Sequence, residues 1–189
     1  MDVDKAIFAR RSIRRFKQKP ISINKLKKFV NAGRLAPSAA NLQPLDFFIV
    51  NDKKLCSKIF ETLSWAGYIK PKWAPALNER PVAYIIILAR DESPWIPRDA
   101  SFAAENIMIS AKTEGIGSCI LCKIDKEKIK EILKIPIEII IDSVIALGYK
   151  LEESVIEEYK DSIKYWRDEK EIMHVPKRKL NDIIHINHY

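Results

Sequence analysis

Apolar residues along this chain recur at two spacings, and each spacing predicts a different kind of element. Apolar positions three and four residues apart predict a short helix over 4–10, a longer one between Ser22 and Gly33, and a third over 55–63. Ser22 is a typical N-cap residue, and Gly33 lies near the point where such a helix would end. The two early helices therefore enclose a segment rich in arginine.

Continuous runs of β-branched and other apolar residues predict buried strands. These runs lie at 47–50, 84–88, 118–122 and 142–147. The run at 84–88 fits the middle of a sheet, because a strand that is covered on both faces is apolar throughout.

Two further helices are expected between these strands. Small and apolar residues repeat along 100–114, which predicts a helix packed closely in the core, and Gly115 follows it as a stop signal. Asp125 is placed to cap a helix that carries apolar residues at 129–133. Strands and helices intermix without a repeat or a linker rich in Gly or Ser, so we expect a single domain over 1–189.

The last part of the chain has a different character. Residues 152–170 are strongly charged, with Tyr159, Tyr165 and Trp166 as their aromatic anchors. Apolar residues return at 180–186, beyond the last predicted strand. A tail that packs on a second subunit would explain this pattern.

The composition is that of a soluble globular protein. Hydrophobic residues make up 47% of the 189 residues and charged residues 31%, which leaves ample material for a core and excludes disorder. No stretch approaches the ~18 consecutive apolar residues of a membrane span, and the first residues lack the apolar run of a signal peptide. We expect a cytoplasmic protein that does not associate with a membrane.

The chain is also basic. Its 33 Lys and Arg residues against 25 Asp and Glu residues give a formal net charge of +8. Such a surplus attracts nucleic acid, an acidic membrane surface or a phosphorylated cofactor, and net charge by itself does not choose among them. Many lysines alternate with acidic residues, as at 125–131, which is typical of the solvated face of a helix.

Three cysteines are present: Cys56, Cys119 and Cys122. An odd number in a chain without a signal peptide does not favour structural disulfides. Cys119 and Cys122 form a C-x-x-C pair, which occurs in redox sites and in halves of zinc sites. No second pair or nearby histidine completes a metal set, so buried or site-lining thiols are favoured and no metal is predicted.

Two short clusters in the first quarter of the chain carry candidate chemistry. Residues 10–16 read Arg-Arg-Ser-Ile-Arg-Arg-Phe, and their guanidinium and hydroxyl donors suit phosphate or the pyrimidine carbonyls of a flavin. The alternative is a solvent-exposed basic turn. Residues 36–44 read Ala-Pro-Ser-Ala-Ala-Asn-Leu-Gln-Pro, in which small residues let a planar ring approach and amides suit a heterocycle's edge. Taken alone, this loop could also be an ordinary polar turn.

Two more clusters lie further along the chain. Residues 115–119 read Gly-Ile-Gly-Ser-Cys, and the glycines allow backbone N–H groups to reach a ligand. This turn is too short for a dinucleotide-binding fingerprint, and no P-loop is present. Residues 176–180 read Pro-Lys-Arg-Lys-Leu, for which a phosphate partner and a solvated tail are both open.

Together, the four clusters resemble the FMN-dependent nitroreductase family (nitro/flavin reductase-like oxidoreductases) in kind and in order. The resemblance spans nearly the whole chain and is least typical over 51–97. It implies an α+β fold with a central, mostly antiparallel mixed sheet flanked by helices, and a C-terminal extension that packs on a partner subunit. It also implies a homodimer with flavin mononucleotide (FMN) at the interface.

The resemblance assigns cofactor-binding roles to particular residues. Arg10, Ser12 and Arg14 should hold the FMN phosphate, ribityl chain or pyrimidine edge, with Arg11 close by. Positive charge near the pyrimidine edge would stabilise the anionic reduced flavin. The other residues implied are Asn41 on the flavin ring, Ser38 and Ala39 beside it by backbone, Gln43 as a support of the loop, Leu121 and Cys122 facing the reactive nitrogen, and Lys177 and Lys179 at the phosphate.

The resemblance also implies an activity. NADH or NADPH would reduce the flavin, leave, and be replaced by a small-molecule acceptor such as a nitroaromatic or a quinone in a ping-pong cycle. The cofactor carries this chemistry, so no catalytic side chain is predicted. Leu45 and Asp46 stand where the family often has Trp and an Arg or polar residue, which leaves acceptor choice open. Trp65, Trp73 and Trp95 lie in the variable middle, where roofing the site and core packing are equally open.

Two alternatives belong to other functional classes. The first is an FMN-binding protein that stores flavin or senses redox state without turnover. The second is a basic module that binds nucleic acid. The chain lacks a groove-reading motif and an aromatic stacking platform, so we expect no nucleic-acid partner.

Overall fold

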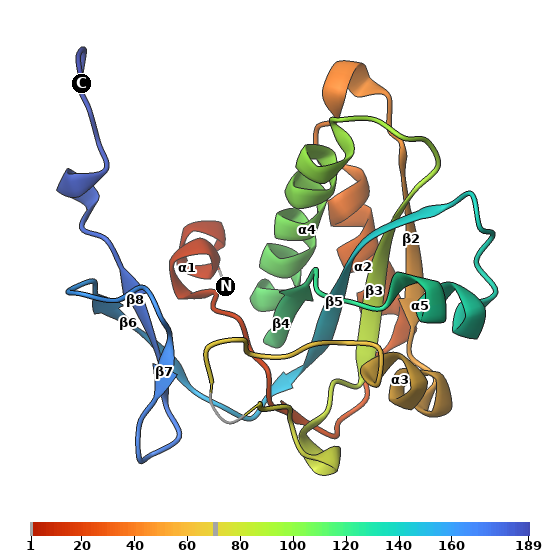
Figure 1. Ribbon diagram of the computed structural model, residues 1–189, viewed down its shortest axis with the longest axis horizontal. Coiled ribbons are helices and arrows are strands. Elements are labelled where there is room, and N and C mark those ends of the chain that lie inside the picture. Colours follow the sequence, from red (N-terminus) through yellow and green to blue (C-terminus); the bar gives the residue numbers. More distant parts are fainter. Residues whose placement is uncertain (1, 70–71) are drawn as a thin grey trace.

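The computed structural model describes residues 2–69 and 72–189. Within these residues, strands form a five-stranded antiparallel sheet and a separate three-stranded sheet (Figure 1). The strands are β1 (Phe16–Lys17), β2 (Leu45–Val50), β3 (Ala83–Ala89), β4 (Ile116–Leu121), β5 (Ile140–Lys150), β6 (Ser154–Glu158), β7 (Trp166–Arg167) and β8 (Met173–Lys177). The helices are α1 (Val3–Ala9), α2 (Ile23–Arg34), α3 (Lys53–Phe60), α4 (Ile96–Thr113) and α5 (Lys126–Leu133).

Strands β3 and β5 form the centre of the larger sheet. β3 pairs with β2 on one side and with β5 on the other, which confirms the central position predicted for 84–88. β5 also pairs with β4 and, near its C-terminal end, with β1. The two residues of β1 are too few to show a hydrophobic period, so the sequence did not predict this strand.

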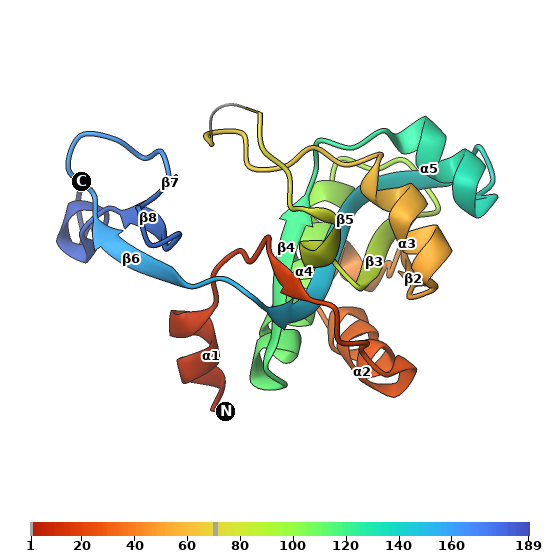
Figure 2. The same ribbon diagram turned by 90° about the horizontal axis from the view of Figure 1, so that it is seen from below.

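Alternate residues of β3 face two separate cores. Tyr84 and Ile86 pack with α3 and α5, whereas Ile85 and Ile87 pack with α2 and α4. This division follows from the period of two along a strand, which sends successive side chains to opposite faces. Figure 2 shows α2 on one side of the sheet and α3 and α5 on the other. Both faces are covered, which explains why the run of residues is continuously apolar.

Local signals set the ends of the helices. Ser22 and Asp125 each accept a hydrogen bond from the backbone N–H three residues on and so cap α2 and α5, as predicted. Gly115 follows α4 with a φ of +73°, a conformation that favours glycine. α4 begins at Ile96, earlier than predicted, because Pro97 lies in its first turn, where a missing N–H is tolerated.

No helix in the described residues is both long and apolar enough to cross a membrane.

The charged C-terminal segment forms the smaller sheet, which the sequence did not predict. β6 and β8 pair in parallel, and β7 pairs antiparallel with β8. Residues beyond β8 extend away from the rest of the molecule (Figure 1), and Leu180 and Ile186 remain 65% and 72% exposed. Packing of this extension on a partner therefore stays a prediction.

The three tryptophans of the variable middle occupy different environments. Trp65 is buried and stacks on Phe60 with 5.6 Å between ring centres. Trp73 is half-buried, and the Arg167 guanidinium lies 4.7 Å from the centre of its ring. Trp95 is exposed. Trp65 thus belongs to the core, and Trp73 contacts the smaller sheet.

Candidate functional site

Residues 10–16, here called the arginine segment, lie directly beside the start of β4. Ser12 and Ser118 form a parallel bridge, and the Ile13 N–H donates to the Ser118 carbonyl over 2.9 Å. Gly117 permits this approach, because a Cβ there would lie 3.0 Å from side-chain atoms of Ile13. Two of the clusters singled out in the sequence, 10–16 and 115–119, are therefore neighbours in the fold.

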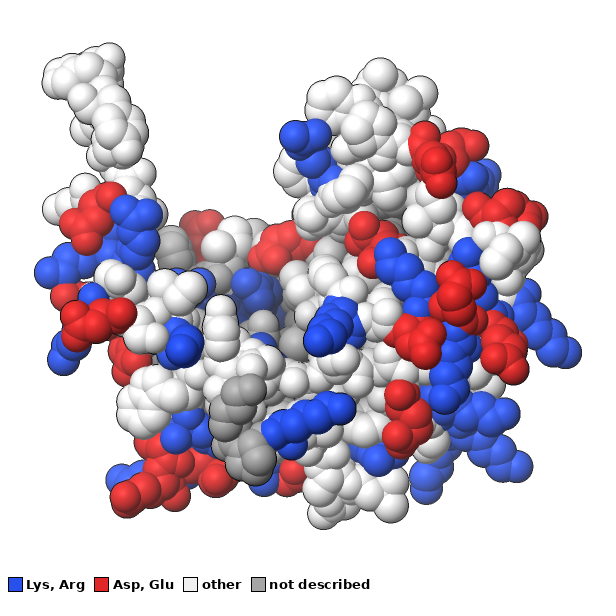
Figure 3. All heavy atoms as spheres, in the orientation of Figure 1, with Lys and Arg blue, Asp and Glu red and all other residues white. Residues whose placement is uncertain are grey.

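A pocket of about 590 Å³ opens next to this pairing. Its walls come from the end of α1, the end of α4, the start of β4 and the turn from β5 into β6. Four cationic residues line it: Arg10, Arg11, Lys112 and Lys150. Figure 3 shows that this face of the molecule is hollowed between the C-terminal extension and the main body, with atoms of both basic and acidic residues inside the hollow. The volume is within the range of small-molecule sites.

The cations of the pocket are crowded. Burial lowers the pKa of Lys112, and the positive charges of Lys150 and Arg11 lower it further. Burial likewise lowers the pKa of Arg11, with the neighbouring Arg10 as a second cause. Cations that disfavour one another in this way are stabilised by an anion placed between them.

The guanidinium groups of the arginine segment point to different partners. Arg10 donates from Nε to Glu105 on α4 over 3.0 Å, and Arg11 donates to main-chain carbonyls at the end of α1. The Arg14 guanidinium instead lies 4.7 Å from the centre of the Tyr165 ring. Arg10 and Arg11 therefore face the pocket, whereas Arg14 lies toward the segment before β7.

The loop at 36–44 holds strained backbone. Ala40, Asn41 and Gln43 have φ values of 48°, 56° and 50°, a left-handed region that non-glycine residues rarely adopt. Hydrogen bonds hold the loop in place. Ala39 N–H donates to Asp99 Oδ1 over 3.1 Å, and within the loop the Gln43 N–H donates to Ser38 Oγ over 3.1 Å. Strain that the surroundings maintain is a feature of functional sites.

This loop and the basic pocket lie at opposite ends of α4. Asp99 in the first turn holds the loop, and Lys112 in the last turn lines the pocket. Thirteen residues separate them, which corresponds to about 20 Å at 1.5 Å per residue. Figure 1 shows the loop beside the N-terminal end of α4, away from the arginine segment. One chain therefore does not bring these two groups of predicted site residues together.

Two further residues that were predicted to bind the cofactor lie at the end of β4. Leu121 is the last residue of the strand and is buried, whereas Cys122 lies just outside it and is exposed. The prediction of a strand through 122 was therefore one residue too long. Burial raises the pKa of the Cys119 thiol, and burial followed by the negative charge of Asp142 raises that of Cys122. All three cysteines are free, and the described residues hold no cluster of potential metal ligands.

The two lysines predicted at the phosphate lie on the C-terminal side of the smaller sheet. Lys177 ends β8 opposite Glu158 of β6. Lys179 Nζ lies 3.0 Å from a Glu158 carboxylate oxygen, and this hydrogen bond raises the pKa of Lys179. Both lysines are exposed, and the described residues that line the basic pocket do not include them.

The structure adds residues that sequence reasoning missed. Lys112, Lys150 and Ser154 line the basic pocket, and Asp99 anchors the loop. Lys112 stands three residues before Gly115, so its place beside the glycine turn could have been noticed. The other three carry no local signal, because their roles depend on distant parts of the chain.

Solved structures share this fold. An FMN-dependent nitroreductase from Clostridium difficile R20291 is 27% identical with a TM-score of 0.69, and the match covers 95% of this chain and 96% of that one. Oxidised iodotyrosine deiodinase bound to FMN and 3-iodo-L-tyrosine matches with a TM-score of 0.72 over 86% of this chain and 97% of that one. At 18% identity, this second likeness shows the fold alone. The fold and its basic pocket define an α+β protein of the nitroreductase-like class.

Sequence comparison narrows the class to a family. A relative from Archaeoglobus fulgidus, provisionally named NADH dehydrogenase/NAD(P)H nitroreductase, is 34% identical over 166 residues, which are 83% of this chain and 90% of that one. The model of the Nitroreductase family matches residues 7–149. The chain belongs to the nitroreductase family. The predicted α+β fold and the predicted class of enzyme, an FMN oxidoreductase that uses NADH or NADPH, are thereby confirmed.

Proposed function

We propose that this protein transfers two electrons from NADH or NADPH to small acceptors such as nitroaromatics or quinones, in two half-reactions at one FMN site. The observation that carries this proposal is the basic pocket beside the Gly117 turn. Burial first, and then the positive charges of Lys150 and Arg11, lower the pKa of Lys112. Glu153 also lines the pocket and pairs with Lys150, which offsets part of this effect, but four cations against one carboxylate still favour an anionic occupant. The phosphate of FMN is such an anion.

The residues of the pocket fit FMN. Ser154 lines the pocket, and its buried Oγ has no hydrogen-bond partner in the described part of the chain, which makes this hydroxyl a candidate donor to a ligand. The arginine segment bridges β4 at Ser12 and Ser118 beside the pocket and then reaches the C-terminal end of β5 at Phe16. A cofactor with its phosphate in the pocket would therefore contact several consecutive residues of this segment. Arg10, Arg11 and Ser12 would hold the phosphate and the ribityl chain.

The flavin ring would lie further along β4, past Ser118. There the Arg14 guanidinium would face its pyrimidine edge, and the backbone near Leu121 and Cys122 its reactive nitrogen. When bound, FMN supplies the hydride and electron chemistry, and the protein supplies binding, orientation and charge. Asp46, which pairs with Arg90 over 2.6 Å, stands beside the 36–44 loop and is a candidate for acceptor choice.

A complete site would need two copies of the chain. The loop that carries Ser38, Ala39, Asn41 and Gln43 lies at the other end of α4 from the pocket, so a second copy would supply it. Apolar side chains are exposed where such a copy would dock, on α1 and on the C-terminal extension. They are Val3, Ile7, Phe8, Leu180, Ile183, Ile184 and Ile186. The extension would also bring Lys177 and Lys179 to the assembled site.

Purification provides the direct test. We expect a yellow dimer with one FMN per chain, bleached by NADH or NADPH and reoxidised by a quinone or a nitroaromatic. Tight flavin binding without bleaching would support storage or redox sensing instead. A colourless protein that FMN does not reconstitute would contradict the proposal.

A charge variant tests the pocket itself. Lys112→Ala removes one of the crowded cations and should weaken FMN binding about tenfold, the effect of one hydrogen bond to a charged group. The matched control is Lys27→Ala, which removes an exposed lysine of α2. Flavin fluorescence titration of the apoproteins measures both affinities, and equal losses in the two variants would show a general charge effect.

A further inference from the structure

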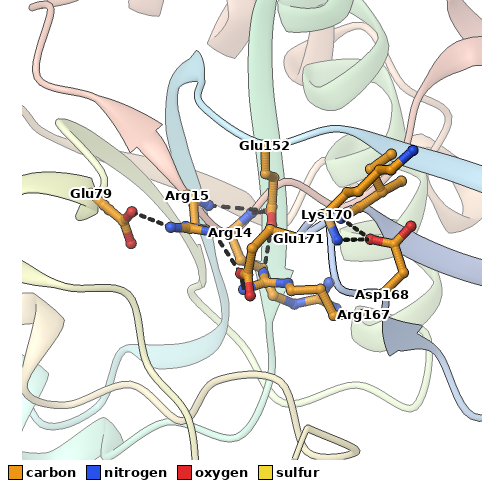
Figure 4. A network of polar contacts seen from close by, with 9 residues as sticks. Arg14, Arg15, Glu79, Glu152, Arg167, Asp168, Lys170 and Glu171 are labelled. Carbon is orange, nitrogen blue, oxygen red and sulfur yellow. Dashed lines mark hydrogen bonds and ion pairs between the residues drawn. The ribbon is translucent and has the colours of Figure 1, made fainter.

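Glu152 is a buried carboxylate whose three described donors all belong to the arginine segment or the smaller sheet. It lies between β5 and β6, and its side chain is 1% exposed. Its Oε1 accepts hydrogen bonds from the backbone N–H of Arg14 and, over 3.2 Å, from that of Arg15. Its Oε2 accepts from Arg167 Nη2 over 2.7 Å. Figure 4 shows these groups converging on the carboxylate.

These contacts close into a ring. Arg167 donates from its second terminal nitrogen, Nη1, to Glu171 Oε2 over 3.2 Å, and Glu171 Oε2 also accepts from Arg15 Nη1 over 2.9 Å. The backbone N–H of Arg15 then leads back to Glu152. Arg15 also pairs with Glu79, at 2.5 Å, and this bond raises the pKa of Arg15 and lowers that of Glu79. The ring therefore joins the arginine segment, the β5–β6 connection and the β7–β8 turn.

This ring of polar contacts leaves the side chain of one neighbouring arginine available for a ligand. Arg15 and Arg167 are each held by two carboxylates, whereas Arg14 has no ion pair among the described residues and contacts the Tyr165 ring. Glu152 holds the backbone of Arg14 rather than its side chain. The Arg14 backbone is thus fixed while its guanidinium is free to meet an anion.

We propose that Glu152 and Arg167 are positioning residues that hold the backbone of the arginine segment so that Ser12 and Arg14 meet the cofactor in a fixed geometry. The proposal takes FMN as the ligand, and that part of it rests on the proposed function. The positioning of the backbone is argued from the ring of hydrogen bonds and ion pairs around Glu152. Neither residue is required to touch the cofactor.

Glu152→Gln tests the proposal because it keeps the shape of the side chain and removes its charge. In the apoprotein, hydrogen exchange at the amides of Arg14 and Arg15 should accelerate about tenfold, as expected for loss of charge from a hydrogen-bonded acceptor. The Kd for FMN, measured by fluorescence titration, should rise by a similar factor. The matched control is Glu61→Gln, which breaks an exposed ion pair with Arg80 outside the ring and should change neither quantity.

A second variant keeps the proposal testable if Glu152→Gln fails to fold. Arg167→Lys keeps the charge but loses the fork that reaches both Glu152 and Glu171, so it should produce smaller changes in the same direction. Unchanged amide exchange in both variants, or faster exchange with an unchanged Kd for FMN, would overturn the positioning role. Failure of the wild-type protein to bind FMN would instead overturn the proposed function, while the exchange experiment would still test the ring.

Discussion

At the scale of single residues, the site depends on positions where a side chain is small or its backbone is strained. Gly117 lets the arginine segment approach β4, because its missing Cβ leaves room for Ile13. Asn41 and its neighbours hold left-handed φ values that cost free energy. These values persist because Asp99 binds the loop from α4 and Ser38 accepts from Gln43 within it. Both features concern the backbone of the site rather than a reactive side chain, as expected where a cofactor carries the chemistry.

Gly117→Ala tests the close approach. Its Cβ would lie 3.0 Å from three side-chain atoms of Ile13, so the pairing must open by a few tenths of an ångström. We expect a loss of about 1–3 kcal/mol in the free energy of unfolding, as for overpacking in a core, together with weaker FMN binding. Urea unfolding and flavin titration measure the two effects.

The control is Gly67→Ala, where an added Cβ meets no atom within 4 Å and φ is not positive. It should change neither quantity. If the two variants behaved alike, close packing at Gly117 would not explain the approach.

At the scale of elements, α4 organises the candidate site. It packs against α2, its N-terminal turn anchors the 36–44 loop, and its last turn contributes Lys112 to the pocket. A carboxylate just after the helix strengthens the contact with α2: Glu114 pairs with Lys28 and with Lys25. Hydrogen bonds from Lys28 and then Lys25 lower the pKa of Glu114 from 4.5 to about 2.

This ion-pair cluster predicts a pH dependence. A carboxyl group with a lowered pKa in the folded state stabilises the protein fully above its ordinary pKa, and that stabilisation is lost as the pH falls through the lowered value. Between pH 4.5 and 2, Glu114→Gln should therefore lose less stability than the wild type does.

Urea unfolding at pH 6 and at pH 3 measures this difference. Glu138→Gln removes an exposed carboxylate that forms no ion pair with the residues the structure describes, and it should follow the wild-type pH profile. Parallel profiles for the wild type and Glu114→Gln would mean that solvent screens the cluster completely.

At the scale of the whole molecule, the separation of the two groups of site residues supports the two-fold assembly proposed above. The basic pocket and the strained loop lie about 20 Å apart along α4, as its rise per residue requires. The C-terminal extension leaves the body of the chain with its apolar side chains exposed. A second copy related by two-fold symmetry would cover those side chains and return the missing loop to each pocket.

Ile186→Asp tests this assembly. The residue is 72% exposed in one chain, so its charge should not affect folding, but it should weaken a dimer that buries the extension. Sedimentation velocity at several concentrations measures the dimer fraction, and FMN content should fall with it. Ile137→Asp is the matched control, because Ile137 is 76% exposed and belongs to the connection between α5 and β5, on the opposite side of the molecule from α1 and the extension (Figure 1). A dimer equally stable in both variants would show that the extension does not contribute to the interface.

The sequence by itself determined the local structure. The helix caps at Ser22 and Asp125, the apolar strand at 84–88 and the stop at Gly115 were predictable because each depends on neighbouring residues and on a fixed period. The clusters at 10–16, 36–44, 115–119 and 176–180 also identified the family, because their order along the chain is itself a signal.

Only the tertiary structure decided which of these parts meet. β1 gains its identity from pairing with β5, Lys112 and Lys150 meet in one pocket, and Glu152 binds a backbone amide 138 positions away. It also separated the Asn41 loop from the pocket, although both clusters fit one flavin when considered as sequence alone. The physical reason is that local propensity acts over a few residues, whereas a binding site is made by contacts that only the folded chain, or two folded chains, can bring together.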